Sequence, residues 1–192
     1  MKKILLTLLV SVSLTFATTV AFNSLEVTLN SNGLKVGDDA PAFVATTIEF
    51  KDYIVGGTKN KIQIIAFVPS LDTGTCKLET IAFNDKVARM GNVELTVVSK
   101  DLPFAQQKFC RNNKITNIKT VSDYKHANNA KRYGTTISAP AFLEGFFARV
   151  IYVVDTKGKI AYVQVVEEIA DEPDYDSIIT FVRKIDRHVK PE

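Results

Sequence analysis

Residues 62–76 read IQIIAFVPSLDTGTC, and they indicate a buried strand followed by a short loop. Its first part, Ile62–Val68, is an almost continuous apolar run rich in β-branched residues, which is typical of a strand buried on both faces. Pro69 ends this strand because proline has no N–H to donate to a central ladder. A short loop follows, so Cys76 falls where a buried strand gives way to the next element.

After the loop, the chain reads as a helix through about Met90, and Gly91 supplies a stop signal. The apolar positions expected on one face of this helix are Leu78, Ile81 and Ala82. Val93–Ser99 then alternates in polarity and predicts a second strand. Strand, helix and strand in this order form a βαβ unit, in which the two strands are parallel.

The remaining elements complete a single α/β domain. The chain predicts a short helix over Pro103–Arg111, a strand over Ile118–Val121, a helix around Lys125–Tyr133 and paired strands over Val150–Asp155 and Lys159–Val166. Pro173 and Asp174 open a last helix, whose buried stripe is Ile178, Ile179, Val182 and Ile185. Near the front, Ser24–Asn30 and Leu34–Val36 predict a hairpin around residues 31–33. The order fits a thioredoxin-like fold, a mixed β-sheet flanked by helices with an added N-terminal β-hairpin.

Composition excludes several classes of protein. The chain has 192 residues, of which 46% are hydrophobic and 23% charged, as in an ordinary globular domain. Its net charge is +3, and the basic residues are scattered rather than clustered, so we expect no nucleic-acid partner.

The first residues predict a secretory signal peptide over 1–21, with the domain over 22–192. Lys2 and Lys3 precede a short apolar run, and 15–17 and 19–21 each offer small residues for cleavage. The run is interrupted by Ser11 and Ser13 and is too short for an ordinary membrane span, although an uncleaved anchor is the alternative. We expect a periplasmic or secreted protein whose mature domain is not stably inserted in a membrane.

Export makes the two cysteines, Cys76 and Cys110, candidates for a disulfide, and a purely structural bridge is one interpretation. Cys76 lies at a helix N-terminus, where free N–H groups and a partial positive charge favour the reactive thiolate. Buried cysteines are also often inert, so position alone leaves a packing role open.

Other candidate residues have two interpretations each. Thr73 could bind a substrate oxygen or simply cap the helix, and Pro69 could shape a site or only end a strand. His126 and His188 are too few and too dispersed for a metal centre, so we expect no metal and no cofactor.

Four motifs in order carry a family resemblance. Residues 67–76 resemble the peroxidatic loop of peroxiredoxins, whose pattern is Pro-x-x-x-Thr-x-x-Cys. Within this loop, the string Ser-Leu-Asp-Thr-Gly-x-Cys is similar to that of the bacterial thiol peroxidase branch. This branch comprises the atypical two-cysteine peroxiredoxins of the Tpx type. Residues 99–110, ending at Cys110, resemble the resolving segment of that branch. Residues 148–155 and 167–175 resemble its active-site arginine strand and its C-terminal end. The resemblance covers almost the whole mature chain.

The resemblance implies a mechanism and partners. Cys76 would attack a peroxide and become a sulfenic acid, and Cys110 would then close an intramolecular disulfide. Thr73 would orient the peroxide, Arg149 would stabilise the thiolate and the leaving oxygen, and Pro69 would shield the thiolate from water. The substrates would be hydrogen peroxide and organic or lipid hydroperoxides. The reductant would be a thioredoxin-like protein outside the cytoplasm, and the chain would form a homodimer.

Two alternatives have different chemistry. A thioredoxin-like disulfide-exchange or redox-carrier protein would react poorly with peroxides, but residues 76–79 lack the second cysteine of a Cys-x-x-Cys motif. A domain with a permanent bridge would resist reduction. A disulfide also requires Cα atoms within roughly 7 Å, so we expect the helical turn around Cys76, or the segment around Cys110, to loosen during catalysis.

Overall fold

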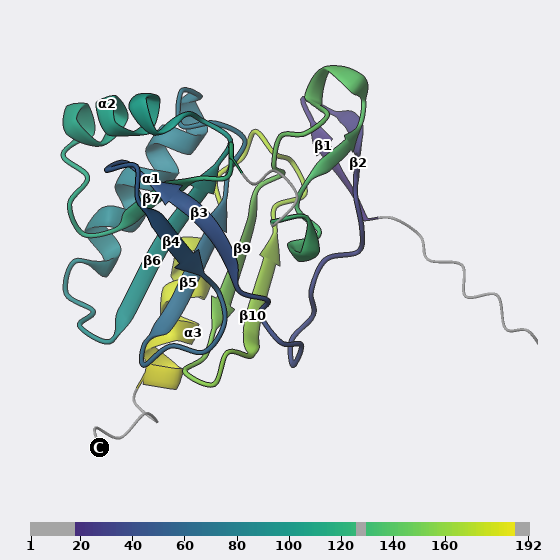
Figure 1. The fold of residues 1–192 in the computed structure, drawn as a ribbon. Coiled ribbons are helices and arrows are strands. Elements are labelled where there is room, and N and C mark those ends of the chain that lie inside the picture. The colour runs from purple at the N-terminus through teal and green to yellow at the C-terminus, as the bar shows by residue number, and fades with distance from the viewer. Residues whose placement is uncertain (1–17, 126–129, 187–192) are drawn as a thin grey trace, which may run out of the picture.

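The computed structural model describes residues 18–125 and 130–186. A seven-stranded mixed sheet in the order β10-β9-β5-β6-β7-β3-β4 forms its centre, and a smaller sheet β1-β2-β8 lies to one side (Figure 1). The strands are β1 (Thr19–Phe22), β2 (Leu25–Leu29), β3 (Phe43–Thr47), β4 (Asp52–Val55), β5 (Ile62–Phe67), β6 (Val93–Ser99), β7 (Lys119–Ser122), β8 (Ile137–Ala139), β9 (Val150–Val154) and β10 (Ile160–Val165). The helices are α1 (Gly74–Val87), α2 (Pro103–Asn113) and α3 (Tyr175–Asp186), with short 3-10 helices η1 (Ala130–Tyr133) and η2 (Ala141–Leu143).

The centre of the large sheet is the predicted βαβ unit. All six residues of β5 are buried, and β5 pairs in parallel with β6 over its whole length. On its other side β5 pairs antiparallel with β9, which forms the predicted hairpin with β10. The thioredoxin-like mixed sheet is therefore confirmed.

Alternate residues of β5 belong to two different cores. Ile62, Ile64 and Ala66 join the core that α1, α2 and α3 cover, so the three helices share one face of the sheet. Ile65 and Phe67 point to the other face, where the small sheet and the segment 130–148 cover them. This alternation is the strand period of two applied to a sheet that is covered on both sides.

The buried face of α1 differs from the prediction. Leu78 is 54% exposed, while Cys76, Glu79, Phe83 and Val87 are buried. A face chosen for its apolar residues was wrong because this helix buries a carboxylate, Glu79, that has an ion-pair partner. In the last helix the predicted stripe is correct at Ile178, Ile179 and Val182, and Ile185 is half-buried.

The N-terminal hairpin exists, but one of its strands was misassigned. β2 falls inside the predicted Ser24–Asn30, yet its partner is β1 and not Leu34–Val36. The turn is made by Asn23 and Ser24, both of which have positive φ, as a two-residue hairpin of the I′ kind requires. The strand β1 begins inside the segment that the sequence assigned to a signal peptide.

Two further differences concern shorter elements. The expected helix around Lys125–Tyr133 is only the 3-10 turn η1, and residues 126–129 lie outside the described residues. The strands β3 and β4, which form a hairpin at the edge of the large sheet, were not predicted. None of the helices in residues 18–125 and 130–186 is long and apolar enough to cross a membrane.

Candidate active site

Cys76 lies in the first turn of α1, directly after the buried strand β5. Thr73 is the N-cap of this helix, and its Oγ1 accepts a hydrogen bond from the Cys76 N–H at 3.4 Å. The Cys76 side chain is fully buried, whereas Thr73 is exposed. The capping interpretation of Thr73 is therefore confirmed, and the sulfur sits at the positive end of the helix dipole.

Arg149 comes from the start of β9, the antiparallel neighbour of β5, and contacts the sulfur of Cys76. It immediately precedes β9, and its Nη2 donates to Cys76 Sγ at 3.5 Å. Nε and Nη2 also donate to the Ile169 carbonyl oxygen, at 3.1 and 2.8 Å. The side chain is 1% exposed, so this guanidinium is dedicated to the interior and is not a surface ion-pair partner.

Glu79 is the member of the site that sequence reasoning missed. It lies one turn after Cys76 and forms an ion pair with Arg149 Nη1 through Oε2, with no exposed surface. Its Oε1 has no hydrogen-bond partner among the described residues. Burial raises the pKa of Glu79 to about 7, although the Arg149 charge lowers it. The sequence feature that could have identified Glu79 is its position three residues after the cysteine, because residues at i and i+3 share a helix face.

Pro69 lies just beyond the end of β5 and is half-buried. The next turn is closed by Thr73, whose N–H and Oγ1 both donate to the Ser70 carbonyl oxygen at 3.1 Å. Pro69 therefore leads directly into the turn that carries the cap of α1.

Cys110 lies apart from the contacts that surround Cys76. It lies near the end of α2 and is 7% exposed, and its Sγ is 3.2 Å from Thr120 Oγ1 on β7. Burial raises the pKa of this thiol, partly offset by Thr120. It lines a hollow of about 360 Å³ together with side chains from the β3–β4 turn and from β7.

Both cysteines are free thiols, and the structure gives each its own partner. Arg149 precedes β9 while Thr120 is on β7, and both β5 and β6 lie between these strands. Neighbouring strands are about 4.8 Å apart, so the backbones of β9 and β7 are separated by roughly 14 Å. The two predicted cysteines are therefore not bonded to each other in this structure, and each contacts a different partner.

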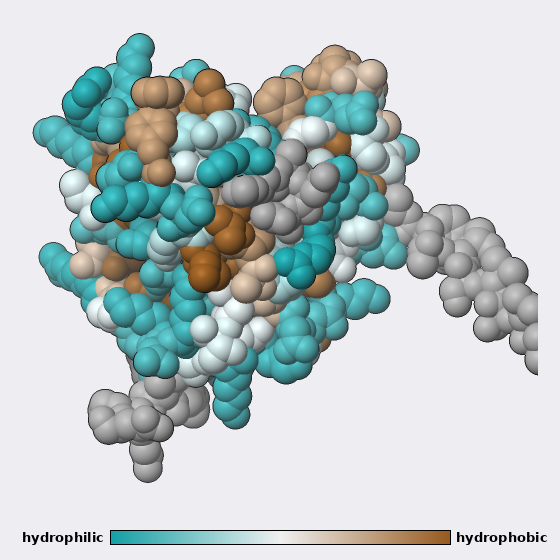
Figure 2. Space-filling model, viewed as in Figure 1, coloured by the Kyte–Doolittle hydropathy of each residue, from teal (hydrophilic) through white to brown (hydrophobic). Residues whose placement is uncertain are grey.

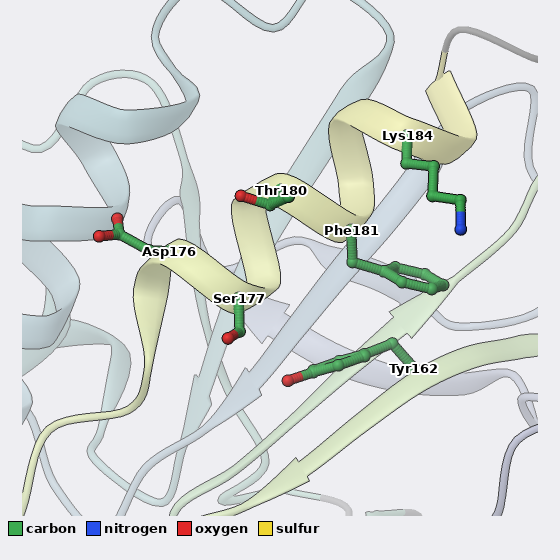
Figure 3. Close-up of a pocket in the computed structure, with 6 residues that line it drawn as sticks. All are labelled: Tyr162, Asp176, Ser177, Thr180, Phe181 and Lys184. Carbon is green, nitrogen blue, oxygen red and sulfur yellow. The ribbon is translucent and has the colours of Figure 1, made fainter.

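A second hollow, of about 470 Å³, lies between α3 and β10 (Figure 3). Tyr162 and Phe181 pack against each other in its lining, with ring centroids 5.2 Å apart. Neither cysteine nor Arg149 lines it, so it is not the candidate site.

Within residues 18–125 and 130–186, no three His, Cys, Asp or Glu side chains gather in a way that could hold a metal ion. His126 and His188 lie outside this range. The groups that meet around Cys76 are a thiol, a guanidinium and a carboxylate.

Comparison with known proteins matches this chemistry. The Redoxin family model matches residues 35–179. The chain is 44% identical over 169 residues to a thiol peroxidase of Aquifex aeolicus, covering 88% of this chain and 99% of that protein. It is 35% identical to a thiol peroxidase of Bacillus subtilis, covering 83% of this chain and 93% of that protein.

Solved structures agree at the level of the fold. A crystal structure of a peroxiredoxin-like protein from Aquifex aeolicus superimposes with a TM-score of 0.84 at 44% identity, covering 87% of this chain and 96% of that one. A thiol peroxidase from Chromobacterium violaceum superimposes with a TM-score of 0.79 at 18% identity, covering 89% and 98% of the two chains, which supports the fold alone. With a cysteine at a helix N-terminus facing a buried arginine, this chain belongs to the thiol peroxidases, thiol-dependent oxidoreductases of the peroxiredoxin kind within the Redoxin family.

Proposed function

We propose that Cys76 is the residue that reduces the peroxide. Its thiolate attacks one peroxide oxygen, so that an S–O bond forms and the O–O bond breaks. The sulfur becomes a sulfenic acid, and the departing oxygen takes a proton and leaves as water or an alcohol. The observation that carries the proposal is the 3.5 Å contact between Arg149 Nη2 and Cys76 Sγ in a buried site.

Arg149 favours the thiolate and then the charge on the departing oxygen. Its guanidinium is fixed on two sides, by the Ile169 carbonyl and by Glu79, so it needs no reorganisation when charge develops. A preorganised donor of this type in a water-excluded site stabilises a transition state more than a mobile one would.

Thr73 supports the same step. Its hydroxyl caps the helix at Cys76 and is exposed, so it can also meet an approaching peroxide. Pro69 sets the direction of the turn that carries Thr73 and limits the access of water to the sulfur. Hydrogen peroxide and organic or lipid hydroperoxides are the proposed substrates.

Cys110 resolves the sulfenic acid. Its thiol attacks the oxidised Cys76 sulfur, an S–S bond forms, and water leaves. A dithiol protein of the thioredoxin kind then reduces the disulfide and restores both thiols. The alternative, a disulfide-exchange or redox-carrier protein without peroxidase activity, would need a fast reaction with protein disulfides and a slow one with peroxides.

The proposal includes export to the periplasm or the outside. Cleavage after Ala17 would leave β1 whole, whereas cleavage after Ala21 would remove most of it. The first site therefore fits a signal peptide better than the second. Mass spectrometry of the mature N-terminus in a cell fraction tests both points, and an unprocessed chain in the cytoplasm would contradict them.

We also propose a homodimer. Phe142 is 64% exposed and Phe146 is 40% exposed, both in the segment between β8 and β9. Figure 2 shows apolar side chains over this segment, above β1 and β2, and others over α2. We expect Phe142→Glu to give a monomer in sedimentation, while Phe104→Glu, at an equally exposed position on α2, leaves the dimer intact. Identical sedimentation of both variants would contradict this interface.

The test of the activity mixes the reduced protein with one equivalent of cumene hydroperoxide and follows thiol loss by stopped flow. Cys76→Ser and Cys110→Ser are measured beside it. Rapid loss that disappears in Cys76→Ser, with a sulfenic acid trapped in Cys110→Ser, supports both roles. Loss no faster than that of a free thiol in all three proteins would exclude the peroxidase and leave a redox carrier or a structural bridge.

A further inference from the structure

Asp101 connects the two cysteine-bearing segments. It lies between β6 and α2, the helix that carries Cys110, and its carboxylate reaches across to the turn that precedes Cys76. Oδ1 accepts from Ser70 Oγ at 2.7 Å, and Oδ2 accepts from the Leu71 N–H at 2.7 Å and from Ser99 Oγ at 2.8 Å. The contact is possible because β5 and β6 are parallel neighbours, so the segments that follow them leave the same edge of the sheet.

A chain of hydrogen bonds leads from this carboxylate to the sulfur-bearing residue. The Ser70 carbonyl accepts from Thr73 Oγ1, which in turn accepts from the Cys76 N–H. The Asp101 backbone is itself anchored, because its carbonyl accepts from Ser122 Oγ on β7. Asp101 is therefore a fixed point against which the first turn of α1 is held.

Other contacts hold these segments in different ways. Asn84 ties the end of the Cys110 segment to α1, because its Oδ1 accepts from the N–H groups of Thr116 and Asn117 at 2.9 Å. Thr75 ties the Cys76 turn to the C-terminal segment through the Ala170 carbonyl at 2.8 Å. Asp101 differs from both, because it joins the loop before Cys76 to the start of the Cys110 helix.

We propose that Asp101 is a positioning residue that sets how long oxidised Cys76 stays in its buried site before it meets Cys110. This inference rests on the proposed roles of the two cysteines. Each thiol has its own partner, and pairing them requires at least one segment to leave its place. The Asp101 carboxylate stabilises the arrangement in which Cys76 faces Arg149, and its loss favours the arrangement in which the thiols can join.

Two reactions compete for the sulfenic acid. In one, the Cys110 thiol displaces water and forms the disulfide. In the other, a second peroxide transfers an oxygen atom to the sulfur, giving a sulfinic acid and water or an alcohol. A longer stay in the buried site favours the second reaction, so Asp101 controls the sensitivity of the enzyme to excess peroxide.

The test compares Asp101→Asn with the wild-type protein. The asparagine amide has the shape of the carboxylate but one acceptor oxygen where the carboxylate has two. Its NH₂ group would face a hydrogen-bond donor, so at least one of the hydrogen bonds is lost. We expect disulfide formation after one equivalent of peroxide to be about tenfold faster, since one charge-assisted hydrogen bond has that scale. At excess peroxide, intact-mass spectrometry should show a correspondingly smaller sulfinic fraction.

Asp155→Asn is the matched control. Like that of Asp101, its carboxylate is held by hydrogen bonds, here from the N–H groups of Lys157 and Lys159. It lies in the β9–β10 turn, and these hydrogen bonds involve neither cysteine. This variant should behave as the wild type in both measurements. If Asp101→Asn does not fold, Ser70→Ala removes one of the three hydrogen bonds and should show the same change at smaller size.

Disulfide formation that is unchanged or slower in Asp101→Asn, or changed equally in Asp155→Asn, would overturn the inference. The wild-type protein separates this failure from that of the proposed function. If its thiol loss does not depend on Cys76, the proposed roles are wrong. If it forms the Cys76–Cys110 disulfide and only the variants fail to differ, the roles stand and the inference about Asp101 falls.

Discussion

Glu79 and Arg149 form an ion pair that is removed from solvent on both sides, and the same guanidinium contacts Cys76 Sγ. Removing one partner of a buried pair leaves an uncompensated charge, which costs about 3–5 kcal/mol of folding free energy. The ion pair therefore affects both the stability of the domain and the reactivity of Cys76. Substitutions of Glu79 and Arg149 can separate these two effects.

Arg149→Gln should lower the rate of thiol oxidation by roughly 10²–10³-fold, which is the typical cost of losing a preorganised donor. It should also lower the free energy of unfolding, because Glu79 loses its partner. The double variant Arg149→Gln, Glu79→Gln should recover most of the stability but none of the rate. Urea unfolding and stopped-flow oxidation measure the two quantities. Recovery of the rate in the double variant would show that Arg149 acts only as a structural partner of Glu79.

Glu79 gives the domain a defined dependence of stability on pH. Burial raises its pKa in the folded protein from 4.5 to about 7, so between these values the folded form binds a proton that the unfolded form has released. The contribution of Glu79 to stability is therefore present below about pH 4.5 and falls as the pH rises to about 7. Glu79→Gln should remove this component from unfolding curves measured across the window. An unchanged slope in the variant would mean that Glu79 is ionised throughout.

Thr73 combines a structural and a chemical role, and two substitutions distinguish them. Thr73→Ala removes the cap and should cost about 1 kcal/mol of stability. It should also slow oxidation of Cys76, because the exposed residue that caps the Cys76 N–H loses its hydroxyl. Thr73→Ser keeps the hydroxyl and should restore both properties. If Thr73→Ala lowers the unfolding free energy but leaves the oxidation rate constant unchanged, Thr73 is only a cap.

The sequence allowed the βαβ unit, the β9–β10 hairpin and α3 to be predicted, because each has a strong local signal. The six buried residues of β5 could not belong to an amphipathic helix, and Pro69 marked the end of the strand. The N-terminal partner strand was missed because most of β1 lies inside the segment that the sequence assigned to a signal peptide. Its turn residues, Asn23 and Ser24, were assigned to no turn.

The members of the site were predicted unequally. Cys76, Thr73 and Arg149 do meet, as the motifs implied, although Arg149 is far from Cys76 in the sequence. Glu79 was missed because a carboxylate in a helix is normally exposed, and only the arrival of Arg149 from β9 makes its burial tolerable. The link through Asp101 was also missed, since it depends on two loops that meet only once the sheet has formed.

The N-terminal strand also supports Arg149, and this link gives the last prediction. The Ala21 N–H donates to the Glu167 carbonyl at 2.6 Å, and the Ala21 carbonyl accepts from the Ile169 N–H at 2.7 Å. The Ile169 carbonyl in turn accepts two of the hydrogen bonds that orient Arg149. β1 thus steadies the peptide that holds the guanidinium in place over Cys76.

A chain that begins at Thr18 should therefore oxidise Cys76 at full rate. One that begins at Phe22 loses both Ala21 hydrogen bonds, each worth about 1 kcal/mol, and should be slower by up to about 30-fold. Stopped-flow oxidation of the two purified proteins measures the difference, and circular dichroism verifies that both are folded. Because Ile169 links β1 to the arginine, Arg149→Gln should still slow oxidation more than Thr73→Ala does when both are made in the shorter chain. Equal rates in two folded proteins would mean that Ile169 holds Arg149 without help from β1, and that cleavage after Ala21 would be harmless to the enzyme.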